Sequence, residues 1–192
     1  MDVTVYLGAH EGDNPVYKQA VVELATWIAQ NGHRLVYGGS DEGLMAVIAD
    51  TVLEQGGEVT GIEGVAHKNL TQLTIVPNIT ERRTRMIELG DVFIAFPGGT
   101  GTLEEISEVV SKVCLDQLTQ PCIFYNLNGF YDDMKALLQR MIDRGTPAWY
   151  LFRFGSCRDR AYYRHAQGIG GSVRSFLFDR FFKKTGTPKR PS

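Results

Sequence analysis

The stretch that most constrains this chain is DVFIAFPGGTGTLEE, over residues 91–105. Residues 92–96 are all apolar, which predicts a strand buried on both faces. The segment 97–99 ends this strand, and a helix is expected from Thr102, where apolar residues begin to recur at helical spacing. Glycines let the backbone approach a ligand, and the free N–H groups of a first helical turn attract anions. The stretch therefore predicts an anion site in a strand–turn–helix unit.

An arginine cluster precedes this strand. Arg82, Arg83 and Arg85 fall near the start of a short predicted helix that ends before Gly90. The helix dipole disfavours cations at a helix N-terminus, whereas the guanidinium group suits phosphate through its two-pronged geometry. The cluster favours an external anion, and the alternative is a solvated, charged helix face.

Strands and helices are expected to alternate along most of the chain. Strands are predicted at 3–8, 34–37, 58–62, 72–76, 92–96 and 122–125, and helices at 15–30, 44–55, 82–89, from 102 onward, and at 131–144. This alternation is typical of a doubly wound, parallel α/β sheet. Ligands in such sheets bind at the carboxyl ends of the strands, so the candidate loops follow Gly8, Tyr37 and Phe96. The second of these loops begins with Gly38 and Gly39.

Charge divides the chain into two parts. Residues 1–147 carry 10 basic and 20 acidic side chains, a net charge of −10, whereas residues 148–192 carry 10 and 2, a net charge of +8. The second part also holds 10 of the 20 aromatic residues. We therefore expect a nucleotide-binding domain over 1–147 and a basic, aromatic-rich segment over 148–192 that is partly disordered.

Several classes of protein are disfavoured by what the sequence lacks. There is no GxxxxGK[ST] motif, no GxGxxG after the first strand and no HExxH motif, so neither a P-loop, a dinucleotide oxidoreductase nor a metal site is expected. Three cysteines without CxxC spacing, no apolar run of about 18 residues and no cleavable signal favour a cytoplasmic protein without a membrane partner.

Several motifs, in order along residues 3–145, resemble the LOG family of cytokinin riboside 5′-monophosphate phosphoribohydrolases. PGGTGTLEE at 97–105 is similar to the family's PGGxGTxxE motif, and LVYGGSDEGLM at 35–45 to its VYGGGxxGLMG motif. DNPVY at 13–17 and ERRTRM at 81–86 resemble its NPxY and ERKxxM segments. The resemblance implies a Rossmann-like fold, a homodimer, and hydrolysis of the N-glycosidic bond of a nucleoside 5′-monophosphate to free base and ribose 5-phosphate.

The resemblance also implies site residues. Arg82 and Glu105 would be the catalytic pair, and the phosphate would be held by Gly98, Gly99, Thr100, Gly101 and Thr102. Further residues expected to bind the substrate are Gly8, Gly38, Gly39, Met45, Arg83 and Glu104. No cofactor is expected: the family is sometimes labelled lysine decarboxylase, but no lysine is expected at a strand end that faces the glycine turns, where pyridoxal phosphate would need one.

Glu105 has a second interpretation. Thr102 to Glu105 also reads as a capping box, in which Thr102 caps the helix and Glu105 reaches back to its N–H. In either case Glu105 is expected in the first helical turn, where the dipole favours a charged carboxylate. With the resemblance, we favour catalysis by a charged stabiliser or base.

Two functions besides catalysis are compatible with parts of the sequence. A nucleotide carrier or sensor without catalysis would need the glycine turns but not Glu105 with Arg82. Binding of nucleic acid or a membrane surface through residues 172–184 is less favoured, because the acidic part would repel polyanions. The segment 148–192 is either a genuine extension or the product of a reading-frame change. The preferred base is adenine, an N6-prenylated adenine or another base.

The predicted homodimer also draws on the helix expected from Thr102. This helix has more apolar positions than one core-facing stripe requires, which suggests a second covered face. These positions are Val109, Val110, Val113, Cys114 and Leu115.

Overall fold

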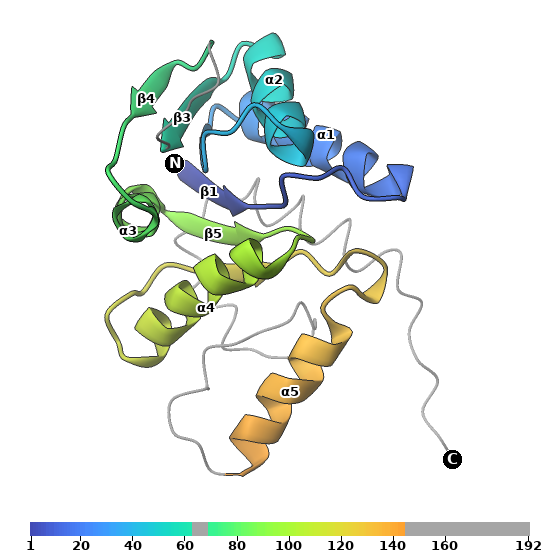
Figure 1. Ribbon diagram of the computed structural model, residues 1–192, viewed down its shortest axis with the longest axis vertical. Coiled ribbons are helices and arrows are strands. Elements are labelled where there is room, and N and C mark those ends of the chain that lie inside the picture. The colour runs from blue at the N-terminus through green and yellow to red at the C-terminus, as the bar shows by residue number, and fades with distance from the viewer. Residues whose placement is uncertain (63–68, 145–192) are drawn as a thin grey trace. The chain divides into compact units, whose positions relative to one another are not determined.

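The computed structural model describes residues 1–62 and 69–144, which form a parallel six-stranded sheet of order β4-β3-β2-β1-β5-β6 (Figure 1). The strands are β1 (Asp2–Tyr6), β2 (Arg34–Tyr37), β3 (Glu58–Ile62), β4 (Gln72–Thr74), β5 (Val92–Ala95) and β6 (Cys122–Phe124). The helices are α1 (Pro15–Gln30), α2 (Gly43–Glu54), α3 (Ile79–Leu89), α4 (Thr100–Cys114) and α5 (Asp132–Asp143), with a 3-10 turn, η1 (Leu127–Gly129), before α5. The predicted α/β fold with a doubly wound parallel sheet is confirmed. The proposed boundary at residue 147 and the segment 148–192 lie outside the described residues.

The helices cover both faces of the sheet. The helices α1 and α2 lie on one face, and α3 and α4 lie on the other (Figure 1). Right-handed crossovers require this arrangement, because the chain moves outward from β1 to β4 and then returns to pair β5 with the other side of β1. The neighbouring strands β1 and β5 are therefore buried on both sides: every residue of β5 is buried, and so is every residue of β1 except Asp2. This explains the unbroken apolar run that the sequence shows at 92–96.

Two helix starts follow from their capping residues. Asn14 accepts a hydrogen bond from the Val16 N–H through its side chain at 3.0 Å, and Pro15 occupies the first helical position of α1, as the sequence predicts. Asn78 caps α3 in the same way, through a 2.9 Å bond from the Glu81 N–H to its Oδ1 atom. The second cap starts α3 three residues before Arg82, so that this arginine belongs to the first turn and a half of the helix.

The surface argument for a homodimer is wrong. The side chains of Val109, Val110 and Val113 are buried within the chain, because α4 contacts both β5 and β1. Of the five positions, Leu115, just beyond the helix, is largely exposed. The homodimer stays a prediction that rests on the family resemblance alone.

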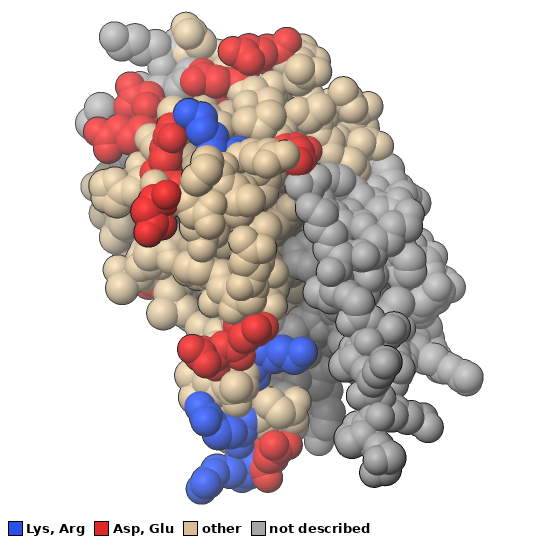
Figure 2. Space-filling model, turned by 90° about the vertical axis from the view of Figure 1, so that its right-hand side faces the viewer, with Lys and Arg blue, Asp and Glu red and all other residues tan. Residues whose placement is uncertain are grey.

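Acidic side chains cluster on part of the described surface. On the face shown in Figure 2, acidic side chains gather toward the top, around a small basic patch. No helix among residues 1–62 and 69–144 has the length and apolar composition to cross a membrane.

The surroundings of His33 indicate that its ring is held in the neutral form. Its ring packs edge-on against Trp27, with the ring centroids 5.1 Å apart, and its buried Nε2 atom has no hydrogen-bond partner among the described residues. Burial, together with the positive N-terminus, lowers the pKa of His33. The folded protein therefore favours the neutral imidazole.

We predict that the free energy of unfolding decreases as the pH falls below about 6.5, the ordinary pKa of histidine, and more so in the wild type than in His33→Gln. Protonation of His33 is easier in the unfolded chain than in the folded protein. The stabilisation that is present above this pH is therefore lost on acidification. Urea unfolding of both proteins between pH 7.5 and pH 5 measures the difference. A difference that does not vary with pH would contradict the prediction.

Candidate active site

The carboxyl ends of β1 and β5 lie side by side at the centre of the sheet. Tyr6 pairs with Ala95, and the Phe96 N–H donates to the Tyr6 carbonyl at 2.8 Å. From this point the chain leaves β1 for α1 on one face of the sheet and leaves β5 for α4 on the other. The strand order reverses here, which is where doubly wound sheets bind ligands. A cavity of about 450 Å³ opens between the two loops.

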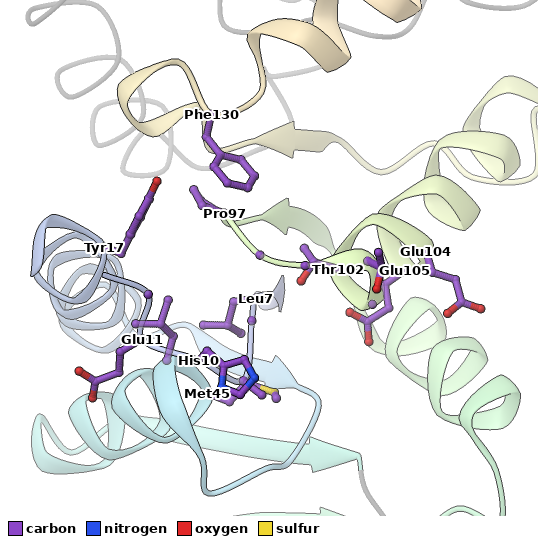
Figure 3. Close-up of a pocket in the computed structure, with 18 of the residues that line it drawn as sticks. Leu7, His10, Glu11, Tyr17, Met45, Pro97, Thr102, Glu104, Glu105 and Phe130 are labelled. Atoms are coloured by element: carbon purple, nitrogen blue, oxygen red, sulfur yellow. The ribbon is translucent and has the colours of Figure 1, made fainter. Parts of the chain in front are cut away.

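The wall of the cavity combines three groups of residues (Figure 3). One is the glycine turn and the start of α4: Pro97, Gly98, Gly99, Thr100, Gly101 and Thr102. The second comes from α3 and α4: Ile79, Arg82, Arg83, Glu104 and Glu105. The third faces them from the loop after β1, the starts of α1 and α2, and the segment before α5: Leu7, Gly8, Ala9, His10, Glu11, Gly12, Tyr17, Leu44, Met45 and Phe130.

The glycine turn brings two backbones into close contact. A Cβ atom on Gly98 would overlap the Thr102 hydroxyl and would lie 3.0 Å from the backbone nitrogen of Gly8. A Cβ atom on Gly99 or Gly101 would meet nothing within 4 Å. Gly98 is therefore required by packing, whereas the other two glycines keep the turn open toward a ligand.

The helix after the turn starts earlier than predicted. Its first residue is Thr100 and its N-cap is Gly99, with no side chain capping the first turn. The prediction that Thr102 is the N-cap is wrong: Thr102 is the third helical residue, and its side chain is buried against Gly98. Among the described residues, no side-chain hydrogen bond is recorded to the leading N–H groups of α4, and free N–H groups at a helix start favour anion binding.

Glu105 does not form a capping box. It is the sixth residue of α4, and its Oε1 atom accepts a hydrogen bond at 3.1 Å from Nη2 of Arg82, on α3. The two side chains are only 9% and 16% exposed, so the ion pair is largely shielded from water. Arg82 and Glu105, the two residues predicted to be catalytic, are therefore in direct contact.

Burial changes the expected acidity of Glu105. Because the carboxyl group is removed from water, its pKa is raised, and the positive charge of Arg82 opposes this effect only in part. The expectation that the helix dipole in the first turn favours the ionised form is wrong, because Glu105 lies beyond that turn. A raised pKa brings Glu105 closer to the range in which a carboxyl group exchanges protons near neutral pH.

The other arginines of the cluster also meet carboxylates. Arg83 donates to Glu104 at 2.7 Å and to Glu108 at 3.0 Å, both on α4. Arg85 pairs with Glu88 on its own helix at 2.9 Å and does not line the cavity. The three arginines thus have protein partners, which the sequence analysis did not foresee. The start of α4 remains as the part of the wall that offers uncompensated positive potential.

The predicted loop after Tyr37 contributes less than expected. Gly38 and Gly39 do not line the cavity, and the segment reaches it through Leu44 and Met45 at the start of α2. Gly39 has a φ of +86°, which suits a glycine, and Gly38 lies against Arg82. The remaining residues predicted to bind substrate, including Gly8, Arg83 and Glu104, all line the cavity.

Sequence reasoning missed several lining residues. The rings of Tyr17 and Phe130 form an edge-on pair with centroids 6.4 Å apart, at the opposite side of the cavity from Glu105 (Figure 3). Tyr17 belongs to the DNPVY segment and could have been found from that motif. Phe130 lies just after η1 and carries no local signal. His10 lines the cavity from the loop after β1 (Figure 3).

A metal centre is not indicated in the part of the chain that the structure describes. There, no group of three or more His, Cys, Asp or Glu side chains is placed to hold a metal ion.

Comparisons with known proteins agree with the sequence motifs. The profile of a family described as possible lysine decarboxylase matches residues 45–151. The chain is 38% identical over 156 residues to the cytokinin riboside 5′-monophosphate phosphoribohydrolase of Rhodococcoides fascians, covering 76% of this chain and 79% of that protein. It is 33% identical over 150 residues to an enzyme of the same name from Arabidopsis thaliana, covering 74% and 70%. It covers 65% of the length of a probable enzyme of this kind from rice, at 30% identity.

Solved structures share the fold at lower identity. A molybdenum cofactor binding protein from Rippkaea orientalis aligns with a TM-score of 0.58 at 23% identity, covering 72% of this chain and 84% of that one. The Moco carrier protein of Chlamydomonas reinhardtii aligns with a TM-score of 0.60 at 16% identity, covering 72% and 84%. These likenesses support the fold alone.

We predict different effects of adding a methyl group at neighbouring glycines of the turn. Gly98→Ala should lower the free energy of unfolding by about 1–3 kcal/mol, because the new Cβ atom overlaps Thr102. Gly101→Ala is the matched control and should not lower stability, because its Cβ atom would meet nothing within 4 Å and alanine is favoured over glycine within a helix. Urea unfolding measures both, and equal losses would contradict the packing role of Gly98.

Proposed function

We propose a phosphoribohydrolase activity for this chain, which belongs to the family of the cytokinin riboside 5′-monophosphate phosphoribohydrolases. The reaction would hydrolyse the N-glycosidic bond of a nucleoside 5′-monophosphate, giving free base and ribose 5-phosphate. The observation that carries the proposal is the buried pair of Arg82 and Glu105 beside the open glycine turn of α4. A nucleotide-binding protein without catalysis has no need for a buried carboxylate at this place.

The phosphate would bind at the start of α4. The N-cap Gly99 has no side chain to occupy the N–H groups of the first turn, and a Cβ atom on Gly99 or Gly101 would meet nothing within 4 Å. Glu105 follows Thr100 by five residues, which corresponds to about 7.5 Å along the helix axis at the usual rise. This spacing is of the size that would let one bound ribose 5-phosphate reach from the phosphate site to the carboxylate.

Glu105 would act on the ribosyl carbon that loses the base. Cleavage of an N-ribosidic bond develops positive charge on the ribose ring, by analogy with glycoside hydrolysis, and a nearby carboxylate stabilises that charge. Glu105 would also accept a proton from the attacking water as the new C–O bond forms, and this proton would then pass to the departing base nitrogen. Arg82 would hold the carboxylate in position through their hydrogen bond.

The base would occupy the more apolar side of the cavity. Leu7, Leu44 and Met45 lie there with the ring pair of Tyr17 and Phe130. Flat aromatic faces and aliphatic side chains suit a purine ring or an apolar substituent on it. Adenine and N6-prenylated adenine both remain compatible with this lining, and homodimerisation remains part of the proposal on the grounds of the family resemblance.

We predict that the protein releases base from AMP or an N6-substituted AMP much faster than from the corresponding nucleoside. The reason is that only the monophosphate can use the anion site at the start of α4. Chromatography of free base after incubation with matched pairs of nucleotide and nucleoside measures the effect. Equal rates would contradict the role of the phosphate site, and bound but intact AMP would favour the alternative of a carrier or sensor.

We predict that Glu105→Gln folds but loses turnover by about 10²-fold or more. The amide keeps the shape and an acceptor for Arg82, but it loses the charge and the ability to take a proton. Glu108→Gln is the matched control, because Glu108 lies on the same helix outside the cavity. It should keep turnover near that of the wild type.

The wild-type rate should also depend on the ionisation of Glu105. Because burial raises the pKa of this carboxyl group, kcat/KM should decline with falling pH at a value above the ordinary pKa of glutamate. A folded, fully active Glu105→Gln variant would show that the catalytic assignment is wrong.

A further inference from the structure

Gly38 lies directly against the guanidinium group of Arg82. A Cβ atom at Gly38 would be 2.8 Å from Nη2 of Arg82, 3.2 Å from its Cζ and 3.3 Å from Sδ of Met45. The first distance is shorter than van der Waals contact, so a side chain at this position and the present position of Arg82 exclude each other. Nη2 is also the atom that donates to Glu105.

Backbone conformation does not explain the glycine. Gly38 has no positive φ, unlike its neighbour Gly39, whose φ is +86°. An alanine would therefore be compatible with the backbone at Gly38, and the requirement for glycine comes from the space that Arg82 occupies. Gly38 is also not part of the cavity wall, so it has no direct contact to offer a substrate.

Arg82 can make room for a side chain at Gly38 only by moving its guanidinium group. Its side chain is largely buried, and the Nη2 atom that lies beside Gly38 is the one that donates to Glu105. Nη2 would have to move away from the added methyl group, and this movement changes the 3.1 Å hydrogen bond to Glu105.

We propose that Gly38 is a positioning residue: its missing side chain creates the seat in which Arg82 holds the carboxylate of Glu105. The proposal rests on the proposed function in so far as the pair is catalytic, but the seat itself is a feature of the fold. The glycine turn after β2 would thus contribute to the reaction without contacting the substrate.

The seat predicts a specific kinetic effect. In Gly38→Ala, kcat should fall at least tenfold, whereas KM should change less than threefold, because the phosphate site at the start of α4 is separate. In the wild type, the positive charge of Arg82 lowers the pKa of Glu105. Because the variant weakens this pair, the pKa of Glu105 should rise. The acid limb of the pH profile should therefore move to higher pH.

A double-mutant cycle with Arg82→Lys tests the mechanism. Lysine lacks the forked guanidinium group and places no atom equivalent to Nη2 in the seat. Adding Gly38→Ala to Arg82→Lys should therefore cost less than twofold in kcat. An equal cost in both backgrounds, or an effect on KM alone, would overturn the proposal.

Two measurements that do not depend on activity complete the experiment. The midpoint of thermal unfolding of Gly38→Ala should stay within a few degrees of the wild type, because the end of a flexible side chain can yield; failure to fold would show that something other than Arg82 requires the glycine. A ¹³C NMR titration of the Glu105 carboxyl group should show a raised pKa in Gly38→Ala. An unchanged pKa would overturn the proposal. An inactive wild type that still shows the shift would contradict the proposed function and leave the seat supported.

Discussion

The pairing of β1 with β5 is the interaction on which the candidate site depends. Both strands are buried by helices on two faces, and the register that pairs Tyr6 with Ala95 makes them end at the same level. Because the chain continues toward opposite faces of the sheet, the two following loops separate and leave a cavity between them. Gly8 and Gly98 lie close together there, and a Cβ atom on Gly98 would overlap Thr102 and crowd the backbone nitrogen of Gly8.

Electrostatics at this edge of the sheet come from the contact between α3 and α4. Arginines of α3 face glutamates of α4, so most of the positive charge is balanced within the protein. A buried ion pair contributes little net stability, because desolvation offsets the attraction, but losing one partner is costly. This favours the proposed chemical role for the pair of Arg82 and Glu105, and it is consistent with the proposal that the backbone at the start of α4 binds the anion.

Much of the fold could be predicted because strands and helices have different apolar periods and distinct end signals. The strands and most helices lie within a few residues of their predicted bounds. The errors have physical causes. Helix α4 begins at Thr100, two residues before the predicted start, so Glu105 lies beyond its first turn. Residues 102–105 do match the capping-box pattern. Glu105 instead pairs with Arg82, which lies 23 positions away in the sequence and is therefore outside any local pattern. The valines of α4 face a sheet rather than a partner.

By itself, the sequence determined the order of the elements, the strand–turn–helix unit at 91–105 and the resemblance of the site motifs to those of a known family. These properties are encoded in neighbouring residues, through periodicity, glycine positions and motif spacing. Only the tertiary structure decided that Arg82 lies between Gly38 and Glu105, that Arg83 is held by two carboxylates, and that Phe130 meets Tyr17. Each of these contacts joins segments far apart along the chain. Their distances depend on how helices pack on the sheet, and no local pattern of residues specifies that packing.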